Sequence, residues 1–195
     1  TLYRKVQRTA QGYEEAGKVD LQALVPIIQR WLESAGTTNP SKQRLVLALS
    51  AIAVALCTTT WQTAVPDLLR LATAQPLSKL AWCALLSIPE QLSAVVHTYV
   101  KTDKRTEALL GASDALLGAA LSTAAITVSH AADEAPTGTI ADSEFSLVMQ
   151  TLAQWSKVMG LQLASHAGFA AHLVALLDSP AASSEVVTEV VLEVL

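Results

Sequence analysis

The histidines are the side chains of this chain best suited to bind a metal ion, and their spacing does not favour such a site. His166 and His172 stand six residues apart, so one helix face would not carry both, and no Cys or carboxylate pair accompanies them. His97 and His130 are expected near helix ends, where an imidazole can interact with the negative end of the helix dipole. The sequence therefore predicts no metal site.

The sequence also lacks the motifs that mark a catalytic nucleophile. Ser113 follows Gly111 without the Gly-X-Ser-X-Gly pattern of a hydrolase, and the chain has no glycine-rich phosphate loop. Cys57 and Cys83 each lie in an apolar run, which predicts buried free thiols in a reducing compartment. We therefore expect a protein that is not an enzyme and uses no cofactor.

The composition is typical of a soluble helical protein. Apolar residues make up 51% of the chain and aromatic residues 5%, and no segment alternates in the manner of a strand. The net charge of −4 disfavours general binding to nucleic acid. Residues 45–66 carry no charge, but their strongly apolar part ends at Cys57, which favours a buried helix over a membrane span.

The segment 41–72 predicts two helices joined by a short polar turn. Apolar residues recur at helical spacing in both halves, at Leu45, Leu49, Ile52 and Leu56 and then at Val65, Leu68, Leu69 and Ala72. The threonines at 58–60 end the first helix, and Trp61 opens the second. Further apolar residues off the stripe indicate that the first helix is covered on more than one side. We expect the two helices to pack antiparallel.

Similar helices are expected along the rest of the chain. Asp20 can cap a helix over 21–34, in which Pro26 should mark a bend or a late start. Other helices are predicted over 2–15, 76–88, 90–100, 106–131 and 142–160, followed by a pair that begins at residue 168. All four tryptophans, Trp31, Trp61, Trp82 and Trp155, fall on helical stripes, which predicts core packing.

Helix-opening prolines give the chain a repeat. Pro40, Pro76 and Pro180 are spaced as in paired-helix repeats of roughly 35 to 47 residues. Because a single pair cannot bury its apolar face, the pairs must stack. The sequence therefore predicts an all-α fold, an α-solenoid of HEAT-like antiparallel helix pairs (an α-α superhelix), as one segment over 1–195. Helical patterns at both ends favour a fragment of a longer chain.

One pattern begins at Gln43-Arg44-Leu45, runs through Leu56, and continues with Trp61, Val65 and Leu68-Leu69. This pattern resembles importin-β-type karyopherins, and it is most similar to their transportin-SR branch, the nuclear importers of serine/arginine-rich splicing factors. Later, the segment 84–90 resembles a leucine-rich helix ending in a Pro-Glu step. The segment 152–155, with Gly160, Phe169 and 173–177, resembles a tryptophan helix and the pair after it. The chain departs from the family in being rich in alanine and poor in charge.

The resemblance implies a HEAT-repeat arc with outer A helices and inner B helices, which would make 2–15 and 41–57 inner helices. It implies a nuclear transport receptor that shuttles between cytoplasm and nucleus. Such a receptor binds the GTP form of the small GTPase Ran, protein cargo and nucleoporins, with no direct contact to nucleic acid or membrane.

Cationic residues on the two inner segments are the candidate partner-binding residues, namely Arg4, Lys5, Arg8, Lys42 and Arg44. Solvated helix flanks are the alternative interpretation of these residues. Solenoids bind through many contacts spread over a concave face, so no short motif is expected. A generic HEAT or armadillo scaffold, or an adaptor for protein–protein interaction, is the alternative function.

Overall fold

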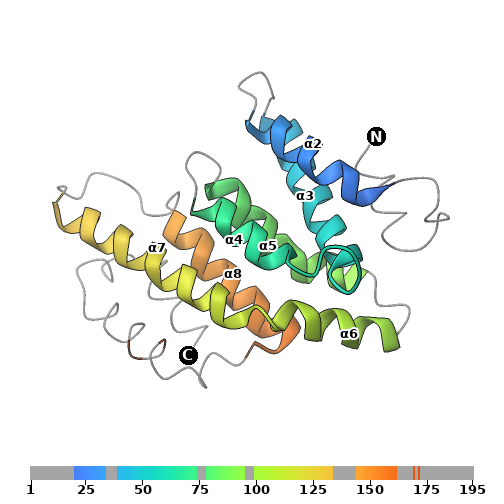
Figure 1. Cartoon of the computed structure of the whole chain (residues 1–195). Helices are drawn as coiled ribbons and strands as arrows, with labels where there is room; N and C mark the ends of the chain where they lie inside the picture. The colour runs from blue at the N-terminus through green and yellow to red at the C-terminus, as the bar shows by residue number, and fades with distance from the viewer. Residues whose placement is uncertain are drawn as a thin grey trace. The chain divides into compact units, whose positions relative to one another are not determined.

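The computed structural model describes residues 20–33, 39–73, 78–94, 99–133, 144–161, 169 and 171 (Figure 1). Within these ranges the regular structure is α-helical throughout, which confirms the predicted all-α class. None of the described helices is long and apolar enough to cross a membrane. The contacts divide the chain into two compact units, Thr1–Ala112 and Ser113–Leu195, here called unit 1 and unit 2.

Unit 1 contains five described helices, α2 (Leu21–Glu33), α3 (Asn39–Leu56), α4 (Ala64–Ala72), α5 (Ser78–Ala94) and α6 (Tyr99–Leu110). The backbone N–H of Ala23 donates to the Asp20 carboxylate at 3.2 Å, which confirms the predicted cap of α2. Pro26 lies inside α2, so it does not delay the start of this helix. The helix α3 ends before the threonines, as predicted, whereas α4 begins three residues after Trp61.

Two predicted helix boundaries in this region are wrong. The helix expected to close at Ile88-Pro89 continues to Ala94, and Pro89 is buried within it. Burial of Ile88, Pro89 and Leu92 offsets the backbone hydrogen bond that a proline removes. The long helix expected over 106–131 is instead divided between α6 and α7. The break falls at Gly111, a residue of low helix propensity, and the next N–H, from Ala112, bonds the Leu109 carbonyl at 3.2 Å in a tighter turn.

The pairing of helices in unit 1 differs from the prediction. The most extensive contact joins α3 to α5, and α5 also packs against α4, while α2 packs against α3 (Figure 1). Contact between α3 and α4 is slight. The prediction that these two helices form a packed pair is therefore wrong. The helix α4 has only nine residues and therefore a short apolar face, and it buries this face on α5. The pairs are therefore α2 with α3 and α4 with α5.

The helix α3 is the centre of unit 1. From Leu45 to Val54 every residue except Leu47 is buried, which confirms that this helix is covered on more than one side. Ser50 is fully buried among them, and its Oγ donates its single proton to the Ala84 carbonyl of α5 at 2.8 Å, with the Val46 carbonyl at 3.0 Å as the alternative acceptor. Ser50 and Ala84 are small, which lets the backbones of α3 and α5 approach closely enough for a hydroxyl to bridge them.

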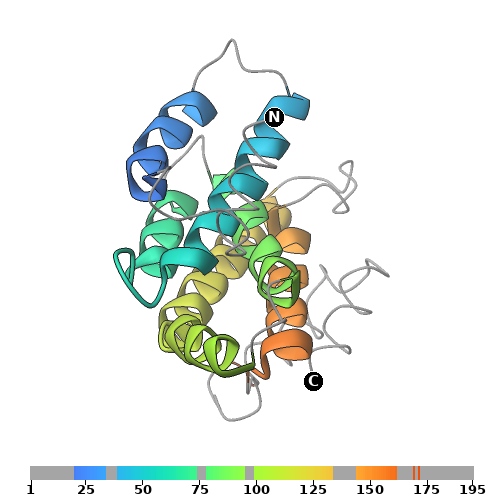
Figure 2. The ribbon, with the colours of Figure 1, turned by 90° about the vertical axis from the view of Figure 1, so that its right-hand side faces the viewer.

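Unit 2 contains α7 (Ser113–Asp133) and α8 (Glu144–Met159), which lie alongside each other (Figures 1 and 2). Its described core includes Leu116, Leu117 and Ala120 from α7 and Val148, Met149, Leu152, Trp155 and Met159 from α8. Val148, Leu152, Trp155 and Met159 lie at helical spacing on one side of α8, and the predicted core packing of Trp155 is confirmed. Whether the two units form one continuous segment stays a prediction.

The end of α8 depends on a glycine. Gly160 has φ +73°, in the left-handed region, and its N–H donates to the Ser156 carbonyl at 3.1 Å. The next N–H, from Leu161, donates to the Trp155 carbonyl at 3.3 Å. This arrangement satisfies carbonyls that the helix end would otherwise leave without partners.

Replacing Gly160 with alanine should lower the free energy of unfolding of unit 2 by about 1–2 kcal/mol, because only the backbone conformation resists the added Cβ. None of the described residues lies within 4 Å of that Cβ, so they contribute no steric clash. Gly118→Ala is the matched control. Gly118 is exposed in the interior of α7, a Cβ there also meets none of the described residues, and the change should stabilise by about 0.5–1 kcal/mol. Chemical denaturation followed by circular dichroism measures both, and equal effects would contradict this account of Gly160.

Candidate functional site

The predicted partner-binding residues that the structure describes lie near the start of α3. Arg44 is exposed and Lys42 is half-buried. Positions two apart on a helix are separated by about 200° around its axis, so these side chains leave α3 on different sides. The structure therefore does not bring Lys42 and Arg44 onto one face. Arg4, Lys5 and Arg8 lie outside the described residues, and the assignment of all five stays a prediction.

An exposed apolar pair occurs on α2, and the sequence predicted core packing for one of its two members, Trp31. Ile27 is 48% exposed and Trp31 is 54% exposed, and their four-residue spacing places them on one side of the helix. The buried side of α2 is formed by Leu21, Ile28 and Leu32. The core prediction is thus wrong for Trp31 and confirmed for the other three tryptophans. The signal was present in the sequence, because Trp31 is offset by one position from Leu32, which with Leu21 and Ile28 forms the apolar series at helical spacing.

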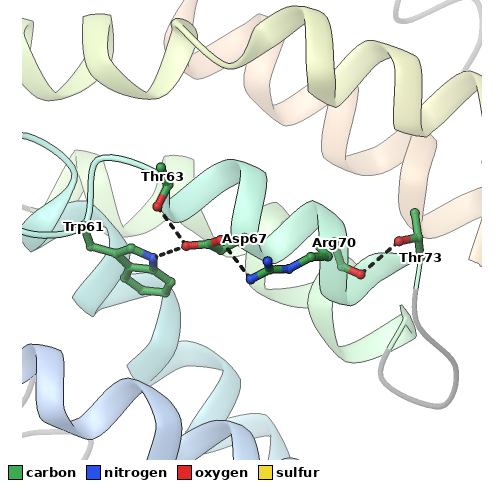
Figure 3. Close-up of polar contacts among 5 residues, drawn as sticks. All are labelled: Trp61, Thr63, Asp67, Arg70 and Thr73. Atoms are coloured by element: carbon green, nitrogen blue, oxygen red, sulfur yellow. Dashed lines mark hydrogen bonds and ion pairs between the residues drawn. The ribbon is translucent and has the colours of Figure 1, made fainter.

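A polar cluster centred on Asp67 fixes the turn between α3 and α4 (Figure 3). Its Oδ2 accepts hydrogen bonds from Trp61 Nε1 at 2.8 Å and Thr63 Oγ1 at 2.9 Å, while Oδ1 accepts from Arg70 at 3.1 Å. Because Asp67 lies in the first turn of α4, its charge also interacts favourably with the positive end of the helix dipole. At the other end of α4, Thr73 Oγ1 donates to the Arg70 carbonyl at 2.9 Å (Figure 3).

The role of this Asp67 cluster is structural. Three donors occupy the Asp67 carboxylate, and the Arg70 side chain that completes the ion pair is 79% exposed. The arrangement anchors the buried indole of Trp61 and sets where α4 begins. Sequence reasoning assigned Trp61 to core packing but did not identify Asp67. The available signal was the four-residue spacing of Thr63 and Asp67, which places the two side chains on one side of a helix.

Asp67→Ala is expected to lower the free energy of unfolding of unit 1 by about 1–2 kcal/mol, because it leaves the Trp61 indole N–H without its acceptor and removes an acidic group from the first turn of α4. Arg70→Ala is the control, and it should cost no more than about 0.5 kcal/mol, since it removes an exposed ion pair alone. Urea unfolding curves give both values. A loss for Arg70→Ala as large as that for Asp67→Ala would show that the ion pair dominates the cluster.

The two cysteines are free thiols held in environments that keep them neutral. Burial raises the pKa of the Cys57 thiol, although the nearby Arg105 charge opposes this shift, and its Sγ lies 3.4 Å from the Val54 carbonyl oxygen. Burial likewise raises the pKa of the half-buried Cys83 thiol against the opposing charge of Lys79. Because the thiolate is the nucleophile, neither site favours cysteine chemistry at neutral pH. The prediction of a buried thiol is confirmed for Cys57.

Metal ligands do not gather in the part of the chain that the structure describes. No group of three or more His, Cys, Asp or Glu side chains there could hold an ion. His97, His166 and His172 lie outside the described residues, so the expectations for them stay predictions.

Comparison with known proteins assigns no family to this chain. No family model, no curated protein and no solved structure matches the chain.

Proposed function

We propose that this chain is part of a nuclear transport receptor that binds the GTP form of the small GTPase Ran and protein cargo. In this proposal, HEAT-like helix pairs stack into an α-solenoid that presents a large protein-binding face. The receptor shuttles between cytoplasm and nucleus and meets nucleoporins on the way. It acts by binding, without catalysis or a cofactor.

The observation that carries the proposal is the packing scheme of unit 1. Each of α2 and α4 packs on the helix that follows it, and those second helices, α3 and α5, pack on each other. A stack of helix pairs requires this scheme, because consecutive pairs must bury their apolar faces on each other through equivalent helices. The second helices then form one layer, and α3 and α5 would be its inner members.

The family resemblance supplies the identity of the partner. Its most continuous stretch, 43–69, covers most of α3, the turn that Asp67 fixes and the first part of α4. In that family the inner helices near the N-terminus hold Ran in its GTP form. Lys42 and Arg44, near the start of α3, are two of the described cations that would lie on such a layer. Because they leave the helix on different sides, a partner on one face of the layer would contact only one of them.

A generic HEAT or armadillo scaffold is the second candidate function. The divergence of Lys42 and Arg44 favours it, since a scaffold needs no convergent basic surface. The low content of charged residues, 15% of the chain, also departs from the karyopherin pattern. A scaffold of this kind would use the same stack of helix pairs to join other proteins, and it would not respond to the nucleotide bound to Ran.

Nucleotide-dependent binding separates the two functions. Ran loaded with a non-hydrolysable GTP analogue or with GDP is immobilised, and binding of the 195-residue chain to each form is measured by biolayer interferometry. A transport receptor should prefer the GTP form by at least about ten-fold, equivalent to about 1.4 kcal/mol of binding free energy. Equal affinity for the two forms, or binding to neither, would contradict the transport proposal and favour the scaffold.

A further inference from the structure

We draw no further inference here: the strongest candidate, the exposed apolar pair Ile27 and Trp31 on α2 of unit 1, carries none because nothing in the structure shows what covers it.

Discussion

Replacing Trp82 with alanine is expected to lower the free energy of unfolding of unit 1 by about 3–5 kcal/mol. Trp82 is fully buried in α5, the helix that packs against both α3 and α4. Removing its indole leaves a cavity that the surrounding helices can fill only in part, so the lost transfer free energy and the lost packing add together. Urea denaturation followed by circular dichroism measures the change.

Two further variants make this prediction specific. Trp31→Ala removes an indole that is 54% exposed, so it should cost less than about 1 kcal/mol. Trp82→Phe keeps most of the buried volume, and none of the described residues accepts a hydrogen bond from the Trp82 Nε1, so its cost should be well below that of alanine. Similar losses for Trp31→Ala and Trp82→Ala would contradict the assignment of α5 to the core.

Ser50→Leu is expected to destabilise unit 1 by about 2–4 kcal/mol, the second large effect. The larger side chain must fit at the contact between α3 and α5, which overpacks the core, and the hydroxyl that bridges to the Ala84 carbonyl at 2.8 Å is lost. Ser50→Ala removes the hydrogen bond without the added volume and should cost about 1 kcal/mol. The difference between the two variants therefore measures how closely the helices approach.

Ser122→Leu is the matched control for this prediction. Ser122 also donates to the carbonyl four residues earlier in its own helix, at 2.9 Å to Gly118, but it is exposed in α7. Its replacement should change the free energy of unfolding by no more than about 0.5 kcal/mol. If Ser50→Leu were tolerated as well as Ser122→Leu, α3 and α5 could not form the close contact on which the proposed stack depends.

Local features of the fold could be predicted from the sequence because they depend on short-range chemistry. The apolar spacing located α3 and α8, the threonines marked the end of α3, and Asp20 identified the start of α2. The apolar residues off the stripe of α3 correctly indicated that it is covered on more than one side. Each of these predictions follows from helix periodicity or capping, which adjacent residues determine.

Features that depend on tertiary contacts could not be predicted in the same way. A short turn between α3 and α4 indicates that the helices are close, but the short apolar face of α4 and the long one of α5 decide which contact dominates. Pro89 reads as a helix breaker until its burial is known. The role of Asp67 depends on the Trp61 indole N–H folding back onto α4, a contact that no helical stripe reveals.

Only the residue types of the candidate site could be predicted from the sequence. The sequence identifies the cations near the start of α3, and helix geometry shows that Lys42 and Arg44 diverge. Which of them contacts a partner depends on the complex. The proposal that α3 is an inner, partner-binding helix therefore requires a binding measurement.

The affinity for GTP-loaded Ran, compared among four forms of the chain, tests whether α3 is a partner-binding helix. The forms are the unmodified chain, the double variants K42E/R44E and K42A/R44A, and the control R30E, which reverses an exposed cation on α2, a proposed outer helix. K42A/R44A is included so that loss of charge can be distinguished from misfolding, and circular dichroism verifies the fold of each. We predict tight binding by the unmodified chain and by R30E, with a dissociation constant at least about ten-fold higher for K42E/R44E. Absence of binding by the unmodified chain, or an equal loss in R30E and K42E/R44E, would contradict this prediction.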